Sequence, residues 1–521
     1  MSRHLTRFLT CVALGATGSL HAELKLPAII GDHMVLQQKQ ANPIWGWDTP
    51  GTTVTVTFAG QSKSAVASAG TGKWSVKLDP LPANAQPAVL TVKGTSERSL
   101  QDVLVGEVWI CSGQSNMQWD LRQSDDGDLD ALTAKLPRLR LISVPQVGTQ
   151  DLKDDFQGAW AACTPETAAS FSAVGYYFGR QLHESLEVPV GLIDNAWGGS
   201  AAEAWIRRDV LEKDARFAGL MGEWKAREDA LPKEMAEYEA KLAEWKIKAA
   251  EAETAKQPAP PRPGAPGGWQ NGNSRPGNIF GGVLHPTIGY GIKGAIWYQG
   301  ESNAGRAYQY RTLFPLMITH WREVWQQGDF PFYWVQLADF MTEKPEPVSS
   351  AWAELREAQT LTQSAIPNGG QAVIIDIGEA NDIHPRNKRE VGARLSRLAL
   401  ARDYGFSSLP SRSPEYQSMT AANGKITVTI DHAPGGLRAH DDNTIKGFAI
   451  CGADRNWVWA NATITGEGRN QIEVSSPLVP APVAVRYAWA DNPVCNVVSA
   501  AGLPLTPFRT DDFPMVTAPQ P

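Results

Sequence analysis

Short runs of alternating apolar and polar residues fill the first part of the chain, from residue 23 onward. Stretches such as TTVTVTFAG, KWSVKLDPL and AVLTVKG alternate with a period of two, and Gly, Pro and Asn interrupt them. This alternation, without a helical period, is typical of strands separated by turns. We therefore predict an N-terminal β domain of sandwich-like type over residues 23–102.

The pattern changes between residues 103 and 410. Continuous apolar runs, among them VLVGEVWI, VGLIDNAW, IKGAIWY, FYWVQLA and AVIIDIG, alternate with amphipathic segments such as YRTLFPLMITHWREVW. Strands that are apolar throughout belong in a parallel sheet that helices cover on both faces. The alternation of such strands with helical segments predicts an α/β domain over residues 103–410.

A helical insertion interrupts this domain at residues 210–275. Apolar residues recur there at spacings of three and four, and Pro232 lies where a hairpin of two helices would turn. The Pro- and Gly-rich stretch that follows, QPAPPRPGAPGG, predicts an extended return to the sheet domain. The predicted helical seam consists of Met235, Tyr238, Leu242, Trp245, Ala249 and Ala252.

Helical patterns stop after about residue 410. The runs KITVTID, GFAICG, QIEVSS and PVAVRYAWAD have the strand-like character of the N-terminal part. They predict a second β domain, again sandwich-like, over residues 411–521. The predicted architecture is thus an α/β domain between two β domains.

The first residues predict export. Arg3 and Arg7 precede an apolar stretch that begins at Phe8, and the small residue Ala22 stands before a charged start. This order is typical of a cleaved signal peptide, so we assign residues 1–22 to one and expect a periplasmic or secreted protein. No other stretch of the sequence is long and apolar enough to span a bilayer.

Cleavage would leave four cysteines in an oxidising compartment. Pairing within each predicted domain would join Cys111 with Cys163 and Cys451 with Cys495, whereas free buried thiols are the alternative. The sequence leaves this choice open.

Composition narrows the class of partner. The 521 residues carry a formal net charge of −7 without a long basic run. This charge pattern does not indicate binding to nucleic acid or to an anionic membrane surface. We expect a small polar partner instead. The 19 Trp residues suit both protein cores and the faces of sugar rings. The sequence predicts no oligomeric state.

Polar residues gather in four loops, each of which follows a predicted strand of the α/β domain. VWICSGQSN contains Ser115, LIDNAWGGS contains Gly199, IWYQGESNA contains Asn303, and IIDIGEANDIHP contains His384. Loops at the carboxyl ends of parallel strands meet at one edge of the sheet. Acyl transfer needs a nucleophile, a base and oxyanion donors, and these residue types all occur there. The structural alternative for Ser115 is a helix cap.

The motifs GQSNM, NAWGGS, IWYQGESN and DIHP resemble the sequence blocks of the SGNH hydrolase superfamily. Nearly the whole chain, including FSAVGYYFGR and VRYAWADNP, resembles the sialate O-acetylesterase family. The resemblance implies a flavodoxin-like sheet and a carbohydrate O-acetylesterase without a metal or other cofactor. It also implies that Ser115 is the nucleophile, that His384 is the base, and that the N–H groups of Ser115 and Gly199 and the Asn303 amide bind the oxyanion.

The acid behind His384 departs from the superfamily pattern. That pattern has Asp three residues before the His, where this chain has Asn381. Asp382 lies two residues before His384 and is our prediction for the residue that orients the imidazole. Asp376 and a backbone carbonyl are the alternatives.

Further residues near these loops are candidates for contacts with the substrate. Gln299 and Glu301 belong to the IWYQGESNA loop. Trp119 follows Ser115 by four residues and Trp205 lies close after the Gly pair, so we predict that both rings contact the sugar, with a core position as the alternative. The acetylated sugar itself, whether sialic acid or a xylan-type glycan, stays open.

A noncatalytic glycan-binding protein is the alternative from another functional class. Ser115, Asn303 and His384 are needed by an esterase and not by a lectin, so their joint presence favours the esterase. The chain has neither the G-x-S-x-G motif of α/β-hydrolases nor the H-E-x-x-H motif of zinc proteases. We therefore predict a serine esterase with an acyl-enzyme intermediate and no metal.

Overall fold

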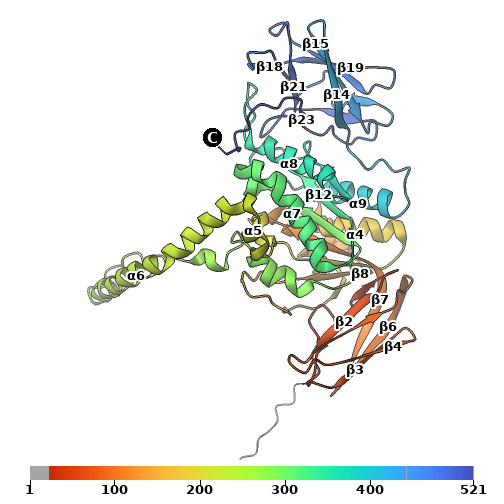
Figure 1. Cartoon of the computed structure of the whole chain (residues 1–521), viewed down its shortest axis with the longest axis vertical. Helices are drawn as coiled ribbons and strands as arrows, with labels where there is room; N and C mark the ends of the chain where they lie inside the picture. Colours follow the sequence, from red (N-terminus) through yellow and green to blue (C-terminus); the bar gives the residue numbers. More distant parts are fainter. Residues whose placement is uncertain (1–22, 442, 520–521) are drawn as a thin grey trace, which may run out of the picture.

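The computed structural model of the chain describes residues 23–441 and 443–519. The α/β part lies in the middle, with a β unit at each end of the long axis (Figure 1). The predicted signal peptide at residues 1–22 lies outside the described residues. Among the helices of the described part, none is long and apolar enough to cross a membrane.

An 11-stranded sheet extends from the N-terminal unit into the centre of the molecule. Its core strands run parallel in the order β8-β10-β7-β11-β12-β13, and β9 pairs antiparallel with β8 at the edge. A flavodoxin-like sheet has its first strand beside its second, whereas here β10 lies between β7 and β8, so that detail differs from the prediction. The bounds are β7 Glu97–Gly113, β8 Leu136–Ser143, β9 Ala161–Cys163, β10 Val190–Asp194, β11 Gly294–Tyr298, β12 Phe332–Gln336 and β13 Gly369–Val373.

Helices cover both faces of this sheet (Figure 1). Every residue of β11, β12 and β13 is buried, as expected for strands between two helical layers. Helix α4 packs against α9, and α7 packs against α8. The long helices are α4 Ala173–Leu186, α7 Ala307–Trp325, α8 Ala351–Ala365 and α9 Lys388–Asp403; the short ones are α1 Ser115–Gln118, α2 Gly127–Thr133, α3 Pro165–Ala169 and α5 Arg208–Lys213.

Strand β7 belongs both to the N-terminal unit and to the central sheet. Its first part pairs antiparallel with β6, and its last part pairs parallel with β10 and β11. Asp102, in the irregular stretch of the part that pairs with β6, has a φ of 57° and forms an ion pair with Arg140 Nη1 at 2.8 Å. The boundary predicted after residue 102 therefore falls inside a continuous strand. The other N-terminal strands are β1 Val35–Gln37, β2 Asn42–Trp47, β3 Thr53–Phe58, β4 Gln61–Val66, β5 Lys73–Leu78 and β6 Asn84–Lys93.

The C-terminal unit consists of antiparallel strands around a second hydrophobic core. One four-stranded sheet has the order β14-β15-β20-β19, and another has the order β18-β17-β21-β23. The strands are β14 Glu415–Ala422, β15 Lys425–Asp431, β16 Leu437–Ala439, β17 Phe448–Cys451, β18 Trp457–Trp459, β19 Asn461–Thr465, β20 Gln471–Ser475, β21 Ala484–Tyr487, β22 Val497–Ser499 and β23 Phe508–Arg509.

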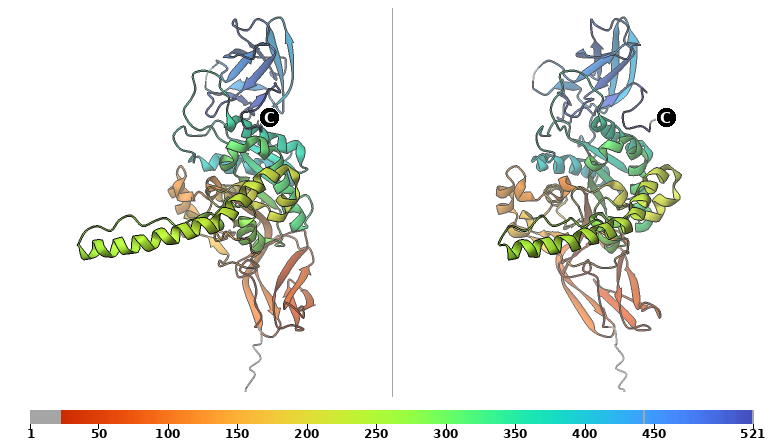
Figure 2. Two further views of the ribbon diagram at one scale, coloured as in Figure 1. Left: turned by 60° about the vertical axis from the view of Figure 1, so that its left-hand side comes forward. Right: turned by 90° about the vertical axis from the view of Figure 1, so that its left-hand side faces the viewer.

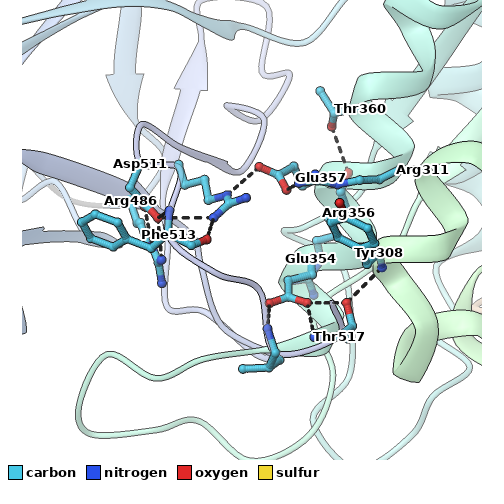
Figure 3. Close-up of polar contacts among 12 residues, drawn as sticks. Tyr308, Arg311, Glu354, Arg356, Glu357, Thr360, Arg486, Asp511, Phe513 and Thr517 are labelled. Carbon is cyan, nitrogen blue, oxygen red and sulfur yellow. Dashed lines mark hydrogen bonds and ion pairs between the residues drawn. The ribbon is translucent and has the colours of Figure 1, made fainter. Parts of the chain in front are cut away.

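Polar contacts anchor the C-terminal segment to α8 (Figure 3). Glu354 accepts the backbone N–H of Thr517 at 3.0 Å, and Arg509 Nε donates to Glu357 at 2.8 Å. The fully buried guanidinium of Arg356 donates to backbone carbonyls of both the loop after β12 and the C-terminal unit. These contacts fix the C-terminal unit against the α/β part.

The insertion differs from its predicted form. Helix α6, Ala218–Thr254, is one continuous helix that projects from the body, with the return segment running beside it (Figure 2). The prediction of a helical hairpin is therefore wrong. Pro232 removes only one backbone donor from the long helix, and the extended segment covers the seam in place of a second helix. The seam residues are half-buried between exposed neighbours, and Trp245 Nε1 donates to the carbonyl of Pro260 at 2.8 Å.

The cysteines of the described residues are all free. Cys111 lies on β7 and Cys163 on β9, with β10 and β8 between them. Strands spaced about 4.8 Å apart put at least about 14 Å between the two, beyond the reach of a disulfide. Burial raises the pKa of the Cys163 thiol to about 12, so that it stays protonated.

Candidate active site

Ser115 lies at the turn that ends the central strand β7 and begins α1. Gly113 has a φ of 134° there, and a Cβ atom at this position would lie 2.1 Å from the carbonyl oxygen of Tyr298. The turn therefore requires glycine. The backbone N–H of Ser115, at the start of the short helix, makes no hydrogen bond to any described residue.

His384 reaches Ser115 from the loop between β13 and α9. Its Nε2 lies 2.8 Å from Ser115 Oγ, and its Nδ1 lies 3.3 Å from Asp382 Oδ1. The same carboxylate oxygen accepts the backbone N–H of His384 at 2.9 Å, which holds the loop in its turn. The structure thus brings Ser115, His384 and Asp382 together in the order that a hydroxyl, an imidazole and its orienting acid require.

The alternative acid, Asp376, is engaged elsewhere. Its two carboxylate oxygens accept from the guanidinium of Arg394 at 2.6 and 2.8 Å. This bidentate pair holds the carboxylate on Arg394, and among the described residues Asp376 makes no contact with His384.

The pKa of His384 is lower than its ordinary value of 6.5, first because of burial and second because of the nearby Lys388 ammonium. Trp119 supplies part of that burial, since its ring stacks on the imidazole at a centroid distance of 4.9 Å. Asp382 acts in the opposite direction and raises the pKa of His384. A lowered pKa keeps the imidazole neutral at neutral pH, which is the state that a general base needs.

A buried polar network, which the sequence analysis missed, lies beside the nucleophile turn. Lys388 Nζ donates to Asn116 Oδ1, and Asn116 Nδ2 donates both to Glu301 Oε1 at 2.7 Å and to the carbonyl of Ile383 at 3.0 Å. Asn116 therefore ties the turn of Ser115 to the loop of His384. Burial lowers the pKa of Lys388 to about 7 and raises that of Glu301.

Asn303 lies in the loop after β11, the strand beside β7, and is only 1% exposed. Its Oδ1 accepts from Gln299 Nε2 at 2.7 Å and from the backbone N–H of Ala202 at 2.9 Å. Its Nδ2 donates to Glu203 Oε2 at 3.0 Å, which leaves the second hydrogen of the amide without a described acceptor. The orientation of this amide is therefore determined by its partners.

The turn after β10 brings two glycines to Ser115. A Cβ atom on Gly198 would lie 3.3 Å from that of Ser115, and the Gly198 N–H donates to Gln118 Oε1 at 2.7 Å. Gly199 has a φ of 69°, and no described residue accepts its N–H. The backbone N–H groups of Ser115 and Gly199, on two neighbouring turns, thus have no acceptor among the described residues.

Two of the predicted substrate contacts are wrong. Trp205 is 0% exposed, packs edge-on against Trp297 at 5.4 Å, and donates its Nε1–H to Ser200 Oγ. Gln299 is also 0% exposed and holds Asn303. Both residues support the site from within the core.

Glu203 is a second functional candidate that the sequence analysis missed. It is 1% exposed, and its carboxylate bonds Asn303 and forms an ion pair with Arg306. The sequence feature that could have indicated it is an acidic residue inside the otherwise small and apolar stretch SAAEAW. No cluster of three or more His, Cys, Asp or Glu side chains in the described part of the chain could hold a metal ion.

Known proteins share both the sequence and the architecture of this chain. A family model described as "Carbohydrate esterase, sialic acid-specific acetylesterase" matches residues 278–398. Sialate O-acetylesterase of Mus musculus is 29% identical over 93% of this chain and 94% of the mouse protein, and that of Homo sapiens is 28% identical over 95% and 94%. The crystal structure of a carbohydrate acetylesterase from Xanthomonas citri is 35% identical, covers 94% of this chain and 100% of its own, and has a TM-score of 0.78. The chain therefore belongs to the sialate O-acetylesterase family and is a carboxylic-ester hydrolase.

Proposed function

We propose that this enzyme removes O-acetyl groups from carbohydrates by a serine mechanism of the SGNH type. The observation that carries the proposal is the 2.8 Å contact between Ser115 Oγ and His384 Nε2 at the carboxyl edge of the parallel sheet. The substrate class comes from the relatives, which are named for acetyl esters of sialate and of carbohydrate.

In the first half of the reaction, His384 Nε2 takes the proton of Ser115 as Oγ attacks the acetyl carbonyl carbon. The tetrahedral intermediate collapses when the bond between the acetyl carbon and the sugar oxygen breaks. His384 then donates its proton to that oxygen, so the sugar leaves as an alcohol and the acetyl group stays on Ser115. Asp382 holds the Nδ1–H and stabilises the imidazolium.

In the second half, His384 takes a proton from water as the water oxygen attacks the acetyl-serine carbonyl. The bond to Ser115 Oγ breaks, the proton returns to Oγ, and acetic acid leaves and loses its own proton to solvent as acetate. Both tetrahedral intermediates carry an oxyanion. The unused N–H groups of Ser115 and Gly199 and the free Nδ2 hydrogen of Asn303 are the donors that we assign to it.

The test is acetate release from a panel of O-acetylated glycans and from an aryl acetate, by the parent enzyme and by Ser115→Ala. The proposal expects acetate release by the parent and almost none by the variant. In the parent, quenching the reaction at low pH should trap an acetyl group on Ser115. Turnover by a folded Ser115→Ala variant would reject the mechanism. Glycan binding without any acetate release would instead support the noncatalytic glycan-binding alternative.

A further inference from the structure

A pocket of about 330 Å³ lies between the first turns of α6 and the loops after β10 and β11. Its volume falls in the range of about 300–1,000 Å³ that is typical of small-molecule sites. Trp224 and Arg227 of α6 line one side, and Ser302 and Arg306 of the β11 loop line another. None of these residues takes part in the proposed acetyl transfer.

The pocket adjoins the proposed oxyanion donors. Ala201, in its wall, follows Gly199 by two residues, and Ser302 directly precedes Asn303. Glu203 connects the two places, because its carboxylate bonds Asn303 on one side and Arg306 in the pocket wall on the other. The pocket therefore lies beside the loops that carry Gly199 and Asn303.

The chemistry of the lining matches a sugar ring. The guanidinium of Arg227 lies over the rings of Trp224 and Trp269 at 5.3 and 5.0 Å, and the Trp224 side chain is half-buried. A tryptophan side chain with guanidinium, carboxylate and hydroxyl groups beside it offers both apolar surface and hydrogen-bonding groups to a carbohydrate.

The charges of the lining are balanced. Arg306 is already paired with Glu203, and Glu223 lines the pocket one helical turn from Arg227. Two carboxylates therefore accompany two guanidinium groups, which favours a neutral hydroxylated ligand over an anionic one.

We propose that this pocket is a subsite for an uncharged sugar residue that is linked to the residue carrying the acetyl ester. The inference rests on the proposed function and extends it, because it makes an oligosaccharide the preferred substrate. It also assigns a role to the insertion, whose first turns supply Trp224 and Arg227.

The experiment compares Trp224→Ala and Arg227→Ala with a matched control, Trp245→Ala. Trp245 lies further along the same helix and is half-buried, and it too has a guanidinium over its ring, that of Arg262 at 5.8 Å. Steady-state kinetics are measured on 4-nitrophenyl acetate and on two matched pairs: acetylated xylose with acetylated xylotriose, and acetylated N-acetylneuraminic acid with the same sugar in sialyllactose.

The subsite predicts that Trp224→Ala raises KM for the oligosaccharide about tenfold and changes kinetics on the monosaccharide and the aryl acetate less than about twofold. Arg227→Ala should have a smaller effect in the same direction, and Trp245→Ala none. Equal losses on all three kinds of substrate, or no loss on the oligosaccharide, would overturn the subsite and leave the proposed function standing. Failure of the parent enzyme to release acetate from either glycan pair would reject the proposed function, and the subsite with it.

Discussion

The two sides of the proposed reaction centre are held very differently. On the oxyanion side, Asn303 and Glu203 are each 1% exposed and Gln299 is 0% exposed. On the proton-transfer side, the side chains of His384 and Asp382 are 26% and 37% exposed. Buried dipoles whose orientation is fixed by hydrogen bonds stabilise a developing charge without reorganising, whereas a base must exchange protons with an alcohol and then with water. The difference in burial thus matches two different tasks.

The largest expected effect on kcat comes from replacing Ser115, the nucleophile on which both the base and the oxyanion donors act. Ser115→Ala should lower kcat by about 10,000-fold or more, since neither the base nor the oxyanion donors can act without the nucleophile. Thermal melting should be unchanged because the side chain is partly exposed. A Ser115→Ala variant that melts normally and turns over at more than a tenth of the parent rate would contradict the assignment.

On the buried side, Asn303→Ala should lower kcat about 100- to 1,000-fold with little change in KM. The reason is that the amide acts on charge that exists only in the transition state. If the melting temperature falls and kcat of the remaining folded enzyme does not, Asn303 has only a structural role. Kinetics corrected for the folded fraction decide between these results.

On the exposed side, Asp382→Asn should lower kcat by about 10- to 100-fold, a smaller loss because solvent can partly replace an exposed carboxylate. Asp376→Asn is the matched control, and it should spare kcat while lowering the melting temperature through the loss of the Arg394 ion pair. A fast Asp382 variant beside a slow Asp376 variant would reverse the assignment.

The smallest effect concerns the pH profile. The Lys388 ammonium lowers the pKa of His384, so Lys388→Met should raise that pKa. Because the base must be neutral, the acid limb of kcat/KM should then move to higher pH. Asp382→Asn should move it to lower pH, since Asp382 raises the pKa of His384, and Lys388→Arg should leave it near the parent position. Identical acid limbs in the Met and Arg variants would show that the charge of Lys388 does not act on His384.

Periodicity in the sequence was sufficient for the parallel sheet, for the edge that carries the four loops, and for the seam of α6. Periodicity was insufficient where contacts with another segment of the chain determined the structure. Pro232 was interpreted as a turn, whereas the Pro-rich segment packs along one continuous helix. Trp205 follows the Gly pair closely but lies in the core, because sequence proximity does not determine which way a ring points.

The buried network was missed for a different reason. Asn116 directly follows Ser115, and Lys388 follows His384 by four residues, so both lie within or close to the predicted catalytic motifs in the sequence. Their contacts, however, cross between the loops after β7, β11 and β13. A lysine that is 0% exposed looks in the sequence like any other lysine at the start of a helix.

Strand β7 has a consequence for how this enzyme assembles. The segment that pairs with β6 and the segment that ends at the nucleophile are one strand, so the N-terminal unit helps to set the register of Ser115. Its partners in the central sheet come from far along the chain, and such distant pairings form slowly during folding. The N-terminal unit is therefore not a detachable module: a cut or a graft after residue 102 would divide the strand that delivers the nucleophile.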